Sequence, residues 1–336
     1  MADMKNELTL LARAKINLSL SVLGRRADGY HELDMLTQSI ELADTLIFRE
    51  SDEISLRLIM DESFSPIDGE TIPNDERNIA LKAAHLVRAA YGVSRSVEIT
   101  LVKRIPSGAG LGGGSADAAT VLLGLNRFWE LTLPFDALLK MAATLGADVP
   151  FCLRGGLLRV RGIGERLTAV DGAPSFPVVI VKPDAGLSTA SVYAAYDRLD
   201  PKPANPSIEL AIKALECGWN AKAVLDELAV GAVSKELDGK IVSYPTEALP
   251  KKTIEAFTET LGNALQPPAV SLLPEIDECV SALNALGASN ARMTGSGSAV
   301  FGIFAEEKAA RNAYERCSKR WRQSFLTRTV QSGVAE

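Results

Sequence analysis

The chain has 336 residues and a formal net charge of −6, and 47% of its residues are hydrophobic while 23% are charged. Its length exceeds the roughly 250–300 residues at which one hydrophobic core usually stops growing, so two domains are expected. An acidic chain repels phosphodiester backbones, which argues against a nucleic-acid partner. A glycine-rich loop with a few cations could still bind a nucleotide.

The four cysteines are widely spaced and the two histidines stand alone, so neither a zinc site nor a disulfide framework is expected. The first residues lack the uninterrupted apolar run of a signal peptide. No stretch approaches the roughly 18 consecutive apolar residues that a membrane-spanning helix needs. We therefore expect a cytoplasmic protein without a membrane partner.

The first strong pattern is an alternation of apolar and polar residues over 12–22. It predicts a half-buried strand that carries Lys15 and Asn17 on the same face. The glycine-containing run 24–29 ends this strand as a turn.

The rest of the chain alternates between strand and helix patterns. Residues near 61–77 are predicted to form a polar loop. The pattern of predicted elements changes beyond about residue 175, where we place the domain boundary. Strands are predicted at 54–60, 97–101 and 178–181, helices at 78–91, 116–129, 135–145 and 306–321, and a strand–turn–strand unit at 291–304.

Between the strand at 97–101 and the helix at 116–129 lies the run 107–115, which contains five glycines. Glycines gathered between a strand and a helix favour a phosphate loop, because successive backbone N–H groups and a helix N-terminus attract anions. A flexible turn is the alternative. The letters GxGxxG are present, but no second strand ending in an acid follows, as a dinucleotide fold requires. No Lys-Ser or Lys-Thr follows the glycines either, so the P-loop pattern fails.

Four sequence blocks resemble those of the GHMP kinases, and specifically their diphosphocytidyl-methylerythritol kinase branch. The blocks are Ala14-Lys15-Ile16-Asn17-Leu18 with Arg26-Ala27-Asp28-Gly29-Tyr30-His31, the loop Pro106 to Ser115, Leu145-Gly146-Ala147-Asp148-Val149-Pro150-Phe151, and Arg292 to Phe301. The resemblance implies a two-domain α+β fold. Its N-terminal domain (1–175) is of the ribosomal protein S5 domain 2 type, its C-terminal domain (176–336) is α/β, and the active site lies between them.

The resemblance also implies ATP as phosphoryl donor and Mg²⁺ bridging its phosphates, with metal ligands that the sequence leaves unknown. The residues expected along the nucleotide are Pro106, Gly108, Gly110, Leu111, Gly112, Gly113, Gly114 and Ser115. Related loops often end in two serines. Here Ala116 follows Ser115, so the second hydroxyl is missing.

Two residues are expected to carry the chemistry. From its position before Val149-Pro150, Asp148 could equally be a helix N-cap or a catalytic group. Lys15 alone would usually be a solvated surface residue. The resemblance implies instead that Asp148 is the general base and Lys15 its electrostatic partner.

Acceptor recognition is expected from four further residues. The resemblance implies that Asn17 hydrogen-bonds the substrate, Tyr30 and Tyr193 sandwich a cytosine ring, and His31 contacts its edge. A packed aromatic and a surface histidine at a hairpin are the ordinary alternative for Tyr30 and His31.

The implied reaction is transfer of the γ-phosphoryl group of ATP to the 2-hydroxyl of 4-diphosphocytidyl-2-C-methylerythritol, in the non-mevalonate route to isoprenoid precursors. The partner is thus a small molecule with a cytidine diphosphate moiety, and the protein is expected to be a monomer or weak homodimer. Three alternatives stay open: another GHMP small-molecule kinase of the homoserine or mevalonate type, a non-catalytic nucleotide sensor, and a dinucleotide oxidoreductase. Residues 217–258 look like an insertion, to which no function is assigned.

Overall fold

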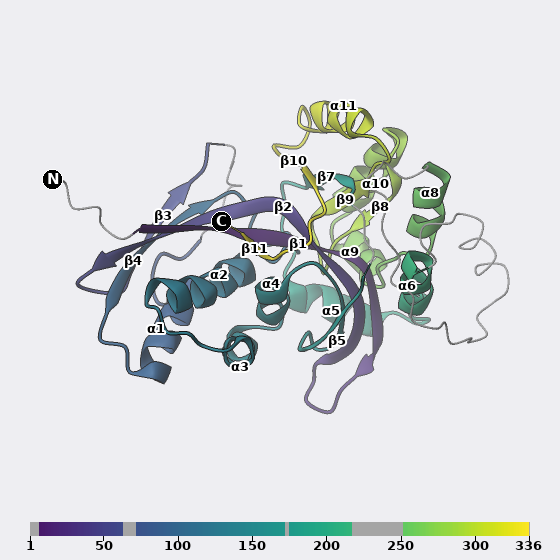
Figure 1. Cartoon of the computed structure of the whole chain (residues 1–336). Helices are drawn as coiled ribbons and strands as arrows, with labels where there is room; N and C mark the ends of the chain where they lie inside the picture. The colour runs from purple at the N-terminus through teal and green to yellow at the C-terminus, as the bar shows by residue number, and fades with distance from the viewer. Residues whose placement is uncertain (1–6, 63–71, 172–174, 217–250, 336) are drawn as a thin grey trace.

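The computed structural model describes residues 7–62, 72–171, 175–216 and 251–335. These residues form a seven-stranded sheet and a four-stranded sheet, with helices packed against each. The two sheets lie side by side along the long axis of the molecule (Figure 1). Residues 217–250, which make up most of the expected insertion at 217–258, lie outside the described residues.

The larger sheet is built on a long antiparallel pair, β1 and β2. Its strand order is β11-β1-β2-β4-β3, and β5 pairs with both β2 and β6. Its strands are β1 (Glu7–Arg25), β2 (His31–Ser51), β3 (Ser55–Met60), β4 (Ser96–Lys103), β5 (Leu157–Gly162), β6 (Arg166–Ala169) and β11 (Val334–Ala335).

Four helices cover one face of this sheet (Figure 1). They are α1 (Ile79–Tyr91), α2 (Gly113–Phe128), α3 (Phe135–Leu145) and α4 (Val149–Arg154). The helix α2 packs against β1 and β2 and is buried along most of its length. A methyl group at Gly124 of α2 would lie 2.3 Å from the ring of Phe48 in β2. The glycine at this position therefore permits the close contact between the helix and the sheet.

The smaller sheet has the order β10-β7-β9-β8. Its helices α10 and α11 pack against these strands, and α5 packs against α9. The elements of this part are β7 (Pro177–Lys182), α5 (Thr189–Arg198), α6 (Ile208–Glu216), α8 (Lys251–Glu259), α9 (Gln266–Leu272), α10 (Glu275–Ala285), β8 (Ser289–Met293), β9 (Val300–Ile303), α11 (Glu307–Cys317) and β10 (Gln323–Arg328).

The strand β1 is buried on both faces, whereas the sequence predicted a half-buried strand. Its polar side chains are covered by segments of the C-terminal part: the Ser19 hydroxyl donates to the carbonyl of Gly262, and the Ser21 hydroxyl to that of Pro206. Apolar alternation identifies a strand but does not show that a second layer covers its polar face. The polar residues of β1 that are at most 4% exposed are Lys15, Asn17, Ser19 and Ser21.

Several predicted elements are confirmed. The helix predicted at 78–91 is α1, whose N-cap Asn78 accepts a hydrogen bond from the backbone N–H of Ala80. The helix predicted at 135–145 is α3. In the described residues no helix is long and apolar enough to cross a membrane. The boundary between 175 and 176, which falls just before β7, stays a prediction.

Candidate active site

Three segments that are far apart in the sequence meet at one place: β1, the glycine loop between β4 and α2, and the loop between β8 and β9. The backbone N–H of Lys15 donates to the carbonyl of Leu111 at 2.9 Å. The backbone N–H of Ala299 donates to the carbonyl of Ala109 at 3.2 Å. The glycine loop is therefore held from both sides by backbone hydrogen bonds.

Glycine is required at two points of this loop. Gly110 has φ +74°, and a methyl group there would lie 2.3 Å from the carbonyl oxygen of Thr294. Gly112 has φ +71°, and a methyl group there would lie 3.0 Å from Cγ of Lys15. Any other residue at these two positions would be strained, because of both the left-handed backbone and the close contacts. The loop has a defined shape, which disfavours the alternative of a flexible turn.

A cavity of about 380 Å³ lies over the glycine loop. Gly112 is the N-cap of the 16-residue helix α2 and provides no side-chain cap, so the first N–H groups of the helix have no capping side chain. Such N–H groups attract anions. The cavity is lined by Ile72, Pro73, Arg77, Asn78, Ile79, Lys103, Ile105, Pro106, Ser107, Gly108, Ala109, Gly110, Leu111, Gly112, Gly113, Gly114, Ser115 and Asp117. Every residue expected along ATP therefore lines it.

A second cavity, of about 190 Å³, adjoins the first. Gly108, Gly110 and Gly112 line both cavities, so the glycine loop forms their common wall. The second cavity is lined by Lys15, Asn17, Leu20, Leu33, Met35, Gly108, Gly110, Gly112, Asp148, Ile163, Leu187, Thr189, Tyr193, Gly295, Ser296 and Gly297.

Lys15 and Asp148 form an ion pair in this second cavity, with Nζ 3.4 Å from Oδ2. The Lys15 side chain is 5% exposed and that of Asp148 is 37% exposed, so the carboxylate is the more accessible partner. Asp148 stands at the N-cap position of α4, but its side chain makes no capping hydrogen bond. Of the two roles that the sequence left open for Asp148, helix capping by the side chain is thus absent from the structure.

Asn17 is almost fully buried, and its amide group is occupied by neighbouring side chains. Its Oδ1 accepts a hydrogen bond from Nζ of Lys15 at 2.7 Å, and its Nδ2 donates to Oγ1 of Thr37 at 3.0 Å. These contacts orient the lysine toward Asp148. Asn17 also lines the second cavity, and its contact with a substrate stays a prediction.

The structure brings His31 and Tyr193 together. The rings of His31 and Tyr193 are stacked with centroids 4.7 Å apart. Burial and the charge of Asp148 raise the pKa of the Tyr193 phenol. Tyr30 is 62% exposed at the hairpin between β1 and β2. The predicted sandwich of two tyrosines around a base stays a prediction.

Asp197 is a further polar residue at this end of the site, and the sequence analysis missed it. Its Oδ1 lies 2.8 Å from Nε2 of His31. Tyr193 and Asp197 are four residues apart on α5 and therefore project from neighbouring positions of the helix surface. This spacing is the signal that could have found Asp197 once Tyr193 had been chosen.

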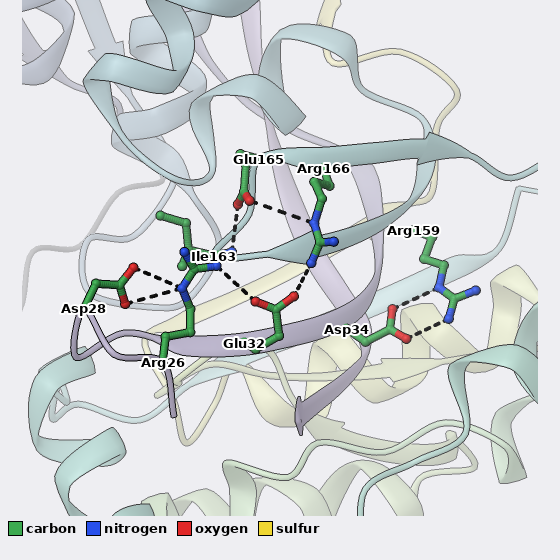
Figure 2. A network of polar contacts seen from close by, with 8 residues as sticks. All are labelled: Arg26, Asp28, Glu32, Asp34, Arg159, Ile163, Glu165 and Arg166. Atoms are coloured by element: carbon green, nitrogen blue, oxygen red, sulfur yellow. Dashed lines mark hydrogen bonds and ion pairs between the residues drawn. The ribbon is translucent and has the colours of Figure 1, made fainter. Parts of the chain in front are cut away.

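The hairpin between β1 and β2 is held against the β5–β6 hairpin by a network of ion pairs (Figure 2). Arg26 pairs with Asp28 at 3.0 Å and with Glu32 at 3.1 Å. Arg166 pairs with Glu32 and also approaches Glu165. Each exposed pair is worth little alone, but the shared Glu32 links the two hairpins into one network.

Two family models match the chain: the GHMP kinases N terminal domain over residues 78–156, and the GHMP kinases C terminal domain over residues 246–323. A 4-diphosphocytidyl-2-C-methyl-D-erythritol kinase from Pelotomaculum thermopropionicum is 40% identical over 322 residues, which are 96% of this chain and 98% of that protein.

Solved structures agree with this relationship. The crystal structure of a 4-(cytidine 5'-diphospho)-2C-methyl-D-erythritol kinase matches with a TM-score of 0.71 and 34% identity, covering 96% of this chain and 99% of that one. A homoserine kinase from Cytophaga hutchinsonii matches with a TM-score of 0.65 at 20% identity over 100% and 98% of the two chains, and shows the shared fold alone. The expected two-domain α+β fold is confirmed. The chain belongs to the GHMP kinases, and within them to the 4-diphosphocytidyl-2-C-methyl-D-erythritol kinase family.

Proposed function

We propose that this protein transfers the γ-phosphoryl group of ATP to the 2-hydroxyl of 4-diphosphocytidyl-2-C-methyl-D-erythritol. The observation that carries the proposal is the position of the Lys15–Asp148 pair in a cavity that shares a wall of glycines with the nucleotide cavity. Phosphoryl transfer requires the donor phosphate and the acceptor hydroxyl to meet in line. The glycine wall between the two cavities is where such a meeting would occur.

Asp148 would act as the general base. Its partly exposed carboxylate faces the second cavity and could accept the proton of an acceptor hydroxyl. Lys15, oriented by Asn17, would stabilise the negative charge on the transferring group. The buried ammonium needs no reorganisation during the reaction, because Asn17 already holds it in place.

The glycine loop would hold the phosphates of ATP. Its backbone N–H groups and the N-terminus of α2 supply partial positive charge without a P-loop lysine. The pattern of positive-φ glycines leaves the loop without side chains that would block the approach of phosphate oxygens.

Magnesium would bind at this site together with the nucleotide. The described residues contain no group of three or more histidine, cysteine, aspartate or glutamate side chains that could hold a metal ion. Mg²⁺ commonly binds through substrate phosphates with few protein ligands, and it neutralises their charge. The Ser115 hydroxyl, in the first turn of α2 beside the nucleotide cavity, would be its protein contact.

Cytidine recognition would fall to His31, Tyr30 and Tyr193. His31 is fixed by Asp197, so that one ring nitrogen is engaged and the other is left to meet the edge of a base. Tyr193 lines the second cavity and offers an aromatic face. Tyr30 is exposed on the hairpin and would fold over the bound base.

The test is a coupled ADP-release assay with ATP, Mg²⁺ and the cytidine-containing acceptor, run beside homoserine and mevalonate. Turnover with the cytidine compound, and with neither of the other two alcohols, supports both the proposed reaction and the proposed recognition of cytidine by this site. Turnover with another alcohol would retain the Lys15–Asp148 chemistry and reject the cytidine assignment. If ATP binds and no alcohol is phosphorylated, the kinase proposal is rejected in favour of a nucleotide sensor.

A further inference from the structure

A buried ion cluster lies beneath the glycine loop. Lys103, the last residue of β4, donates from Nζ to Oδ2 of Asp117 on α2 at 2.9 Å, and also to Asp44 on β2. Each of the three side chains is at most 4% exposed. Charged side chains are almost never buried so completely unless they are paired, and each member of this cluster is paired.

The cluster connects the two ends of the glycine loop. Oδ1 of Asp44 accepts hydrogen bonds from the backbone N–H groups of Arg104, at 2.6 Å, and Ile105, at 2.9 Å. These residues lead directly into the loop. Asp117 lies in α2, which leaves the loop. One ammonium group, that of Lys103, therefore joins the strand before the loop to the helix after it.

The first residue of α2 packs directly on this cluster. A methyl group at Gly113 would lie 3.0 Å from Cγ2 of Ile105 and 3.4 Å from Nζ of Lys103. The glycine thus permits the helix to approach the end of β4 closely. Lys103 and Asp117 also line the nucleotide cavity, so the cluster forms part of its floor.

The electrostatics of the cluster argue against a purely stabilising role. Two carboxyl groups share one ammonium, and Oδ1 of Asp117 is buried with no hydrogen-bond partner among the described residues. Burial, opposed by Lys103 and reinforced by Asp44, raises the pKa of Asp117 to about 8. Burial also acts to lower the pKa of Lys103, but the charges of Asp117 and Asp44 outweigh it and raise that pKa. Buried ion pairs are often no more stabilising than apolar residues of similar volume, so their geometry needs another explanation.

We propose that Asp117, acting through Lys103, is a positioning residue for the phosphates of ATP. The Asp44–Lys103–Asp117 cluster fixes the separation between the end of β4 and the first turn of α2, and with it the shape of the glycine loop. This inference rests on the proposed binding of ATP by that loop.

Asp117→Ala is the test variant, because Lys103 then keeps Asp44 as a partner and no buried ammonium is left unpaired. The matched control is Asp34→Ala. Asp34 pairs with Arg159 in the same sheet (Figure 2), its side chain is 12% exposed, and Arg159 keeps Glu209 at 3.0 Å. Asp34 is absent from the lining of both cavities. Both variants therefore remove one carboxyl group from a cation that retains another acidic partner.

The first measurement is the Kd of a non-hydrolysable ATP analogue with Mg²⁺, by calorimetry and without acceptor. We expect Asp117→Ala to raise this Kd by about ten-fold, which corresponds to about 1.4 kcal/mol of lost binding free energy. The KM for ATP should rise with it while the KM for the acceptor stays unchanged. Asp34→Ala should lower the unfolding temperature and leave both ATP parameters unchanged.

Asp117→Asn is the rescue variant, because an amide oxygen can still accept from Lys103, and its Kd should lie within about three-fold of wild type. If Asp117→Ala does not fold, Asp117→Ser takes its place, since its hydroxyl is polar but too short to reach Lys103. An unchanged Kd in a folded Ala or Ser variant, or an equal loss in Asp34→Ala, would overturn the inference. Failure of the wild type to bind the analogue would instead reject the proposed ATP site itself.

Discussion

Replacing Asp148 with asparagine tests the proposed chemistry with little change in the shape of the site. The Asp148 side chain is 37% exposed, makes no capping hydrogen bond, and pairs with Lys15 at 3.4 Å. Lys15 would keep its hydrogen bond to Asn17. Loss of one partly exposed ion pair costs about 0–1 kcal/mol of unfolding free energy, so the variant should remain folded.

The expected loss of turnover is much larger than this loss of stability. A positioned general base contributes roughly 10²–10⁴ to the rate, or about 2.7–5.4 kcal/mol of the activation free energy. ATP affinity should change little, because Asp148 does not line the cavity over the glycine loop. The prediction is therefore a fall in kcat with an unchanged Kd for ATP.

Single-turnover ADP release, calorimetric ATP binding and thermal unfolding measure the three parts of this prediction separately. Asp136→Asn serves as the control, because it removes the same charge from an exposed position in the first turn of α3. Near-wild-type turnover in folded Asp148→Asn would remove Asp148 from the mechanism. A loss of ATP binding equal to the loss of turnover would show that Asp148 acts on the nucleotide and not on the acceptor.

Three other substitutions probe separate parts of the site. Residue 110 has φ +74°, and Gly110→Ala would place a methyl group 2.3 Å from the carbonyl oxygen of Thr294. We expect the KM for ATP to rise by about ten-fold, and an unchanged KM would refute the need for glycine there. Asp197→Ala frees His31 and should raise the KM for the cytidine-containing acceptor without changing that for ATP, which steady-state kinetics would show or exclude. Asp117 has a folded-state pKa of about 8, above that of an unfolded aspartate, so its contribution to stability is present at low pH and is lost as pH rises toward 8. The free energy of unfolding of wild type relative to Asp117→Asn should then fall between about pH 5 and pH 7.5, by up to about 1.4 kcal/mol per pH unit, and equal slopes in urea titrations would contradict this.

Local features of the fold could be predicted because they depend on short sequence patterns. The spacing of apolar residues was enough for the helix at 135–145. The density of glycines was enough for a loop after β4, but its predicted end was wrong, because residues 113–115 form the first turn of α2. Lys15 and Asp148 were chosen through a family resemblance, and the structure places them 3.4 Å apart. The catalytic roles of both residues stay predictions.

Features that depend on tertiary pairing could not be predicted from local patterns. Asp44, Lys103 and Asp117 come from β2, β4 and α2, and no local pattern around any of them indicates a buried partner. Their burial follows only from the order of the strands and from the packing of α2 on the sheet. Long-range contacts of this kind leave no periodic signal in the sequence.

The burial of the polar face of β1 shows how the two parts of the molecule complete one site. The backbone N–H of Asn17 donates to Oγ1 of Thr294, in the loop between β8 and β9, at 2.9 Å. The amide of Asn17 in turn orients Lys15, so the C-terminal part sets the position of a residue that belongs to the N-terminal sheet. The same part covers Ser19 and Ser21 farther along this face of β1. A fixed ammonium in a site with little water has a larger electrostatic effect on a transferring phosphoryl group than a mobile, hydrated one. The site therefore lies where the two parts meet, because a loop of the C-terminal part contacts the residue that orients the lysine required by the proposed chemistry.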